Sequence, residues 1–119
     1  MTAKPFANVL ACYYVDTELP SHSWRTGEIP ELLRTIAELE SPEEAARFLR
    51  DLCTLSELEA MSHRWHAARL IDEGLPYHEV SRRTGASTTT VTRVAHWLRH
   101  GEGGYRLALD RQASRAPAG

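Results

Sequence analysis

The segment Tyr77–Leu98, YHEVSRRTGASTTTVTRVAHWL, constrains the fold of this 119-residue chain more than any other part of the sequence. Two short segments with helical spacing meet there at Gly85. A tight turn between helices needs a left-handed backbone, which glycine adopts without strain. Apolar residues recur at offsets that place them between two crossing helices, five positions before the glycine and six and nine after it: Val80, Val91 and Val94. The segment therefore predicts a helix-turn-helix over about 77–98.

The remainder of the chain also carries helix signals, and no stretch alternates as a strand would. Ser41-Pro42-Glu43-Glu44 and Thr54-Leu55-Ser56-Glu57 each combine an N-cap hydroxyl with a glutamate three residues later, the pattern of a capping box. Gly74 and Pro76 end the long helix that the second box begins. We expect an all-α fold of about six helices.

The helical signals divide the chain into three parts. Residues 1–26 are expected to form an N-terminal extension, either an arm or a short helix. Residues 27–113 form the helical domain, and residues 114–119 form a flexible tail. Two cysteines far apart, Cys12 and Cys53, form no disulfide framework. No apolar run approaches the ~20 residues of a membrane helix, and the N-terminus lacks a convincing signal-peptide cleavage site, so a cytoplasmic location is expected.

Charge is distributed unevenly along the chain. Residues 1–75 contain seven Lys/Arg and thirteen Asp/Glu, a net charge of −6, whereas residues 76–119 contain seven arginines and three acidic residues, a net charge of +4. This asymmetry indicates a C-terminal half that faces a polyanion, although scattered surface charge is the simple alternative.

The second helix of the motif carries short polar side chains on the face that the valines leave free. Hydroxyl groups of this size let a helix enter the major groove and bond to phosphates or base edges. We therefore expect double-stranded DNA as a partner. The expected DNA contacts are Ser87, Thr88, Thr89, Thr90, Thr92, Arg93 and His96, with Arg82 and Arg83 of the first helix on the phosphate backbone.

Three predicted helices carry apolar faces, and together these faces are larger than the two helices of the helix-turn-helix can bury. We expect a homodimer, and a dimer also presents two recognition helices one DNA turn apart, ~34 Å. The expected core shared between subunits contains Phe48, Leu49, Leu52, Leu58 and Trp65.

Two longer runs, LCTLSELEAMSHRWHAARLIDEG and TGASTTTVTRVAHWLRHGEGGY, resemble the Trp-repressor-related family of the YerC/YecD type. The resemblance covers roughly residues 27–111, and the matching positions are Asp51 to Thr54, Glu57-Leu58, Thr84 to Thr90, Arg93-Val94 and Gly103 to Tyr105. It implies an intertwined homodimer that regulates transcription, with repression as the expected direction and a recognition helix over about 87–100. It also implies a location on the nucleoid.

In the Trp repressor, tryptophan lies between the long helix and the recognition helix, with its indole between two arginines. The resemblance places Arg64 and Arg93 at those positions and Thr54 at the pocket edge. Val94 and Trp97 stand where the repressor has a glycine and a serine, which implies a vestigial effector pocket with no space for tryptophan. Trp97 then either replaces the effector or is an ordinary core residue. Both versions predict DNA binding without tryptophan.

Other function classes have weaker support in the sequence. His96 and His100, and likewise His63 and His66, have helical spacing, but no cysteine or carboxylate completes either pair, so no metal site is expected. No nucleophile elbow, phosphate loop or acid–base pair is present, so we expect neither an enzyme nor a cofactor. A protein-interaction module without DNA binding, and a regulator controlled by an unidentified small ligand, remain the alternatives.

Overall fold

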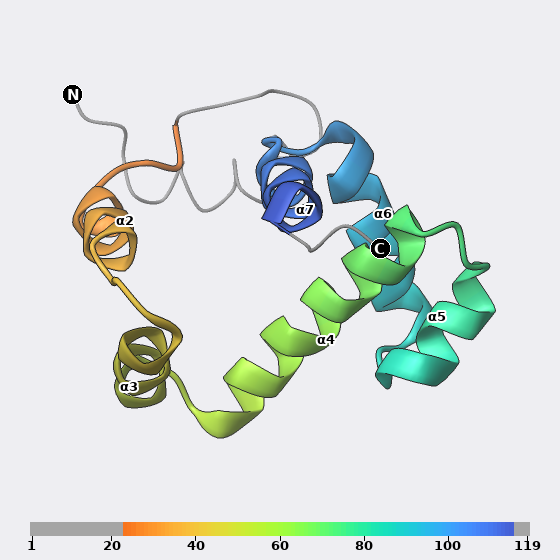
Figure 1. Cartoon of the computed structure of the whole chain (residues 1–119), viewed down its shortest axis with the longest axis horizontal. Helices are drawn as coiled ribbons and strands as arrows, with labels where there is room; N and C mark the ends of the chain where they lie inside the picture. Colours follow the sequence, from red (N-terminus) through yellow and green to blue (C-terminus); the bar gives the residue numbers. More distant parts are fainter. Residues whose placement is uncertain (1–22, 116–119) are drawn as a thin grey trace. The chain divides into compact units, whose positions relative to one another are not determined.

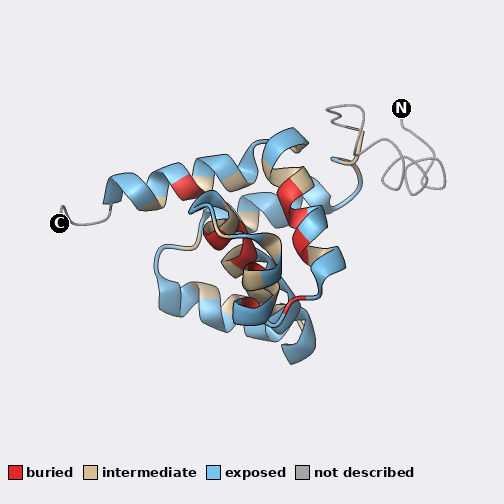
Figure 2. Cartoon of the chain, turned by 90° about the vertical axis from the view of Figure 1, so that its right-hand side faces the viewer, coloured by how far each residue is buried: buried red, intermediate tan, exposed pale blue. Residues whose placement is uncertain are grey.

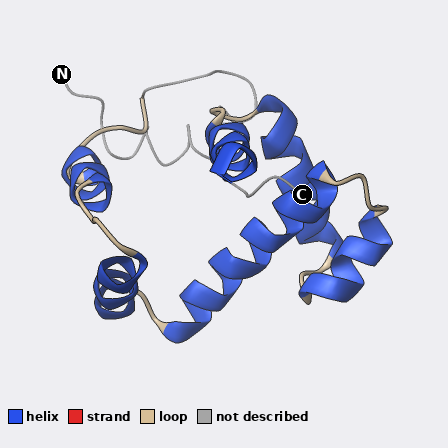
Figure 3. Cartoon of the chain, in the orientation of Figure 1, coloured by secondary structure: helices blue, strands red, loops and turns tan. Residues whose placement is uncertain are grey.

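A computed structural model describes residues 23–115, and every regular element within that range is an α-helix (Figure 1 and Figure 3). The predicted all-α class with six helices is confirmed. The helices are α2 Ile29–Ala37, α3 Pro42–Leu52, α4 Leu55–Asp72, α5 Tyr77–Thr84, α6 Thr88–His100 and α7 Gly104–Arg115. None of these helices is long and apolar enough to cross a membrane.

Both predicted capping boxes begin helices. At α4 the pair is reciprocal, because the Glu57 N–H donates to Thr54 Oγ1 at 3.1 Å and the Thr54 N–H donates to Glu57 Oε1 at 2.8 Å. At α3 the Glu44 N–H donates to Ser41 Oγ at 3.1 Å. The Glu44 carboxylate accepts from the N–H of Glu40, one residue before the cap, at 2.9 Å. These bonds satisfy N–H groups that a helix start leaves unpaired.

The chain divides into two compact units between Leu58 and Glu59. In the first unit, the described residues 23–58 form α2, α3 and the first turn of α4, and none of them is buried. The large apolar side chains that this unit exposes are Ile29, Leu32, Leu33, Ile36, Leu52 and Leu55. Its helices are therefore amphipathic without a core of their own.

The second unit contains the core, which lies where the C-terminal part of α4 meets α5 and α6 (Figure 2). The buried cluster consists of Ala67, Ala68, Leu70, Val80, Ala86, Val91 and Val94. Small residues on α4 let the helices approach closely, and Leu75 and Tyr77 cover the rim of the cluster.

Helix α7 is attached to α4 by a ring contact and an ion pair. The Tyr105 and Trp65 rings stack at a centroid distance of 6.3 Å. The Arg106 guanidinium donates to both carboxylate oxygens of Asp72, at 3.0 and 3.3 Å. Helix α7 continues to Arg115, so the first two residues of the expected tail are helical. Residues 1–22 of the expected N-terminal extension and residues 116–119 lie outside the described range.

Candidate nucleic-acid interface

The turn between α5 and α6 is built on Gly85, as the sequence predicts. Its φ of +82° is left-handed, and its N–H donates to the Ser81 carbonyl at 3.0 Å. Two hydroxyls then fix the turn: Ser81 Oγ donates to the Ala86 carbonyl at 2.6 Å, and the Ala86 N–H donates to Thr84 Oγ1 at 3.0 Å. The role of the buried Thr84 in this turn was not predicted from the sequence, because a threonine at a helix end has no pattern of its own.

The predicted contact between the two helices is confirmed. Val80 and Val91 are fully buried and Val94 is 3% exposed, so the three valines at the predicted offsets form the interior of the motif. The side chains of α6 that point away from this interior are therefore held on a rigid support.

Two of the expected DNA-contacting hydroxyls serve α6 itself. Ser87 is the N-cap, and its Oγ accepts from the Thr90 N–H at 3.1 Å. The same Oγ donates to Thr90 Oγ1 at 3.1 Å, so the two side chains satisfy each other. Ser87 remains exposed at the helix start, whereas Thr90 is half-buried and borders the same hollow as Arg64 of α4.

Thr88, Thr89, Thr92 and Arg93 are exposed on one face of α6, as expected of a reading face. Arg99 joins this face because it follows Thr92 by seven residues, or two helical turns. Arg99 was not among the predicted DNA contacts, although its helical spacing from Thr92 is a signal that the sequence contains. Within residues 23–115, neither Arg93 nor Arg99 has an ion-pair partner.

His96 differs from the expectation of an exposed phosphate contact. The residue is half-buried, and its Nε2 is shielded from solvent without a hydrogen-bond partner. Its ring lies 5.1 Å from the His100 ring and meets Trp97 edge-on at 6.4 Å. Ring contacts therefore hold this side chain, and its Nε2 is not accessible to a phosphate.

Arg82 and Arg83 share a single carboxylate, that of Glu79, one turn earlier on α5. Arg83 Nε donates to Glu79 Oε2 at 2.8 Å, Arg82 Nε donates to Oε1 at 3.3 Å, and Arg82 Nη2 also donates to Oε2. These hydrogen bonds, first from Arg82 and then from Arg83, lower the pKa of Glu79 to about 2. Glu79 was not assigned from the sequence, although its spacing of three and four residues from the arginines is the ion-pair spacing of a helix.

Four of the five expected effector-pocket residues border one hollow of about 340 Å³ between α4, α6 and α7. Val94 and Trp97 both line this hollow, so some space remains beside them, and the expected exclusion of tryptophan stays a prediction. Its complete lining is Arg64, Thr90, Arg93, Val94, Trp97 and Tyr105. Burial raises the pKa of the Tyr105 hydroxyl, and the Arg64 charge partly opposes the increase. Thr54 belongs to the other unit and is not part of the lining.

Metal ligands do not gather in the described part of the chain. No group of three His, Cys, Asp or Glu side chains within residues 23–115 is arranged to hold an ion. Cys53 is a free thiol.

Comparisons with known proteins agree with this arrangement of helices. The family model of the Trp repressor protein matches residues 28–113. The uncharacterised protein YerC of Bacillus subtilis is 41% identical over 87 residues, which cover 73% of this chain and 84% of YerC. The crystal structure of a TrpR-like protein from Eubacterium eligens matches with a TM-score of 0.74 and 30% identity, covering 82% of this chain and 100% of that one. A candidate Trp repressor from Staphylococcus aureus matches with a TM-score of 0.72 and 35% identity, covering 79% of this chain and 94% of that one.

Proposed function

Because the chain belongs to the Trp repressor family, we propose that it is a sequence-specific DNA-binding transcription regulator that acts as a homodimer. The observation that carries the proposal is the exposed face of α6, where Thr88, Thr89 and Thr92 are free while the opposite face is buried against α5. A helix supported in this way can insert its N-terminal half into the major groove.

The side chains of this face suit different parts of DNA. The three threonines are short enough for close approach, and each offers a hydroxyl to a base edge and a methyl to thymine. Arg93 and Arg99 are charged and free of ion pairs within residues 23–115, so they suit phosphates along the groove. The N-terminus of α6, capped by Ser87, adds a positive dipole end.

Dimerisation is proposed from apolar surface that the single chain leaves uncovered. Residues 23–58 contain no buried side chain, and short helices without tertiary packing are marginal in water. Of the expected dimer core, Phe48, Leu49, Leu58 and Trp65 are half-buried, and Leu52 is 52% exposed.

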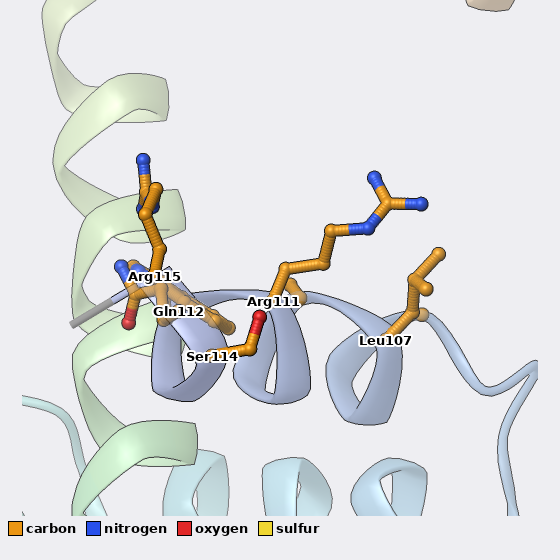
Figure 4. Close-up of a pocket in the computed structure, with 8 residues that line it drawn as sticks. Leu107, Arg111, Gln112, Ser114 and Arg115 are labelled. Atoms are coloured by element: carbon orange, nitrogen blue, oxygen red, sulfur yellow. The ribbon is translucent and has the colours of Figure 1, made fainter.

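A hollow along α7 gives a second copy a place to bind. It has a volume of about 750 Å³ and is lined by Trp65, Leu107 and the arginines Arg111 and Arg115, among others (Figure 4). Leu107 and Arg111 project from the same side of α7 in this view. Residues 23–58 contain eight acidic residues and four arginines, a charge balance that complements this basic helix.

Sedimentation velocity at micromolar concentration tests the dimer, which should sediment at twice the 13.4 kDa chain mass. Leu52→Glu should give monomers, because the charge would be buried at the interface but is tolerated on an exposed monomer surface. Ala46→Glu is the matched control, since Ala46 is also exposed on α3. A monomeric parent protein would refute the dimer.

Site selection from a random DNA library, followed by binding measurements over a range of salt, tests the reading face. Thr89→Ala should lose roughly 1–3 kcal/mol of discrimination at an affected base pair. Arg83→Ala should weaken binding to all duplexes and flatten the salt slope by up to about one unit. Arg47→Ala, an exposed arginine of the first unit, is the control. If neither α5–α6 variant changes binding, this is not the reading face.

The same salt series separates DNA binding from the alternative of a protein-interaction module. Contact with phosphates releases counterions, so the affinity falls steeply with salt, whereas a protein groove has no such requirement. A reporter gene placed behind the selected site then tests whether the effect is repression, which we propose. A regulator of this kind acts on the chromosome, so we propose a cytoplasmic, nucleoid-associated location.

Control by a small ligand is the second candidate function, and the hollow between Arg64 and Arg93 favours it. Two guanidinium groups suit a carboxylate, and Trp97 and Tyr105 supply aromatic walls. We nevertheless propose DNA binding without tryptophan, because Trp97 of the recognition helix already supplies an indole to the wall of this hollow. Two measurements distinguish ligand-controlled DNA binding from DNA binding that is independent of tryptophan: calorimetric titration of the protein with tryptophan, and DNA affinity with and without it. A requirement for tryptophan would establish the ligand-controlled function.

A further inference from the structure

Glu79 is the single acidic residue between Tyr77 and His100, the whole helix-turn-helix. Its side chain is 24% exposed, whereas those of Arg82 and Arg83 are 69% and 53% exposed. The carboxylate therefore lies lower on the surface of α5 than the two guanidinium groups, and it binds the Nε edge of each one. A phosphate that approaches the surface meets arginines that already have an anionic partner.

The charge of this cluster is set by the carboxylate. With its pKa lowered to about 2, Glu79 is ionised at neutral pH. The three side chains together carry one net positive charge instead of two. Arginine binds carboxylates and phosphates through the same fork of N–H donors, so Glu79 and a DNA phosphate compete for the same groups.

We infer that Glu79 is an internal competitor of the DNA backbone, which weakens the phosphate contacts of Arg82 and Arg83 on every duplex. This inference depends on the proposed DNA-binding function. Because contacts to phosphate carry no sequence information, the competition lowers affinity for the regulated site and for random DNA by a similar factor. The competition therefore lowers the overall affinity for DNA and leaves the ratio of specific to non-specific binding unchanged.

The experiment compares the full-length protein with Glu79→Gln, which keeps the shape of the side chain and removes its charge. If one full phosphate contact is gained, binding to a random-sequence duplex should tighten by up to ~15-fold at 50 mM salt and ~4-fold at 200 mM salt. The slope of log K against log salt should steepen by about 0.9.

Two further variants exclude a general charge effect. Glu102→Gln makes the same change in net charge at an exposed residue of the same unit, and it should change affinity much less. In an Arg82→Ala/Arg83→Ala background, Glu79→Gln should give no gain, because the competed groups are gone. Thermal unfolding of each variant confirms that it is folded.

Unchanged or weaker DNA binding by folded Glu79→Gln overturns the inference and shows that the carboxylate is neutral or orients the arginines productively. A gain equal to that of Glu102→Gln also overturns it. If the parent protein binds no duplex at all, the proposed function itself fails, which is a distinct result.

Discussion

Replacement of Gly85 by alanine should destabilise the helix-turn-helix through the backbone alone. The residue has a φ of +82°, and an added Cβ would meet only the His63 ring, at 3.6 and 3.7 Å, which is ordinary van der Waals contact. No steric clash therefore contributes. A non-glycine residue in the left-handed region costs roughly 1–2 kcal/mol. Alanine restricts the unfolded chain, which offsets about 0.4–1 kcal/mol of this cost. We expect a net loss of about 1 kcal/mol.

Urea denaturation followed by far-UV circular dichroism measures this loss at pH 7. Gly85→Asn is the informative companion, because asparagine adopts the left-handed region more readily than alanine, so its loss should be smaller. Gly104→Ala is the control. Its φ is not positive, nothing lies within 4 Å of an added Cβ, and alanine favours the helix there.

The order of stability expected is therefore Gly104→Ala at or above the parent, then Gly85→Asn, then Gly85→Ala. Equal losses for alanine and asparagine at position 85 would show that the backbone conformation is not the cause. If Gly85→Ala were as stable as the parent protein, the left-handed turn would be refuted.

Three other predictions concern the same unit. Gly101→Ala should cost about 1–3 kcal/mol in urea denaturation, because its Cβ would lie 2.5 Å from the Trp97 carbonyl oxygen and 2.6 Å from the Trp97 ring; equality with Gly104→Ala would contradict this. Val91→Ala, at a fully buried position, should lose about 2–3 kcal/mol by the same assay, and a loss below 1 kcal/mol would mean that the motif is not the core. The pKa of Glu79 is depressed in the folded protein, so its ionised carboxylate stabilises the fold at pH values above its ordinary pKa of 4.5. This contribution to the free energy of unfolding is lost as the pH falls towards about 2. Urea midpoints between pH 5 and 2 should therefore fall more steeply for the parent than for Glu79→Gln, and parallel curves would contradict the ion-paired carboxylate.

Much of the secondary structure could be predicted from the sequence because its signals are local. A capping box needs only four consecutive residues, and the Thr54–Glu57 box begins α4 with the two reciprocal hydrogen bonds that the pattern predicts. The turn at Gly85 follows from the conformational freedom of one residue, and the buried valines follow from the period of the helix. The helix-turn-helix and its exposed threonines were therefore determined by the sequence alone.

Which polar side chains of the motif are free became clear only in the folded structure, through rotamers within single helices as well as through packing between them. Ser87 and Thr90 satisfy each other, His96 is shielded, and the Arg82–Arg83 pair is held by Glu79. A list of polar residues on a helix face does not distinguish these cases, because the partner depends on rotamer and on the neighbouring surface. The hollow beside Trp97 was likewise hidden from the sequence, since its volume depends on how Tyr105 of α7 packs against α4. Residue size at two aligned positions predicted a pocket with no space for tryptophan, whereas the space between three helices is set by their separation, which only the folded chain determines.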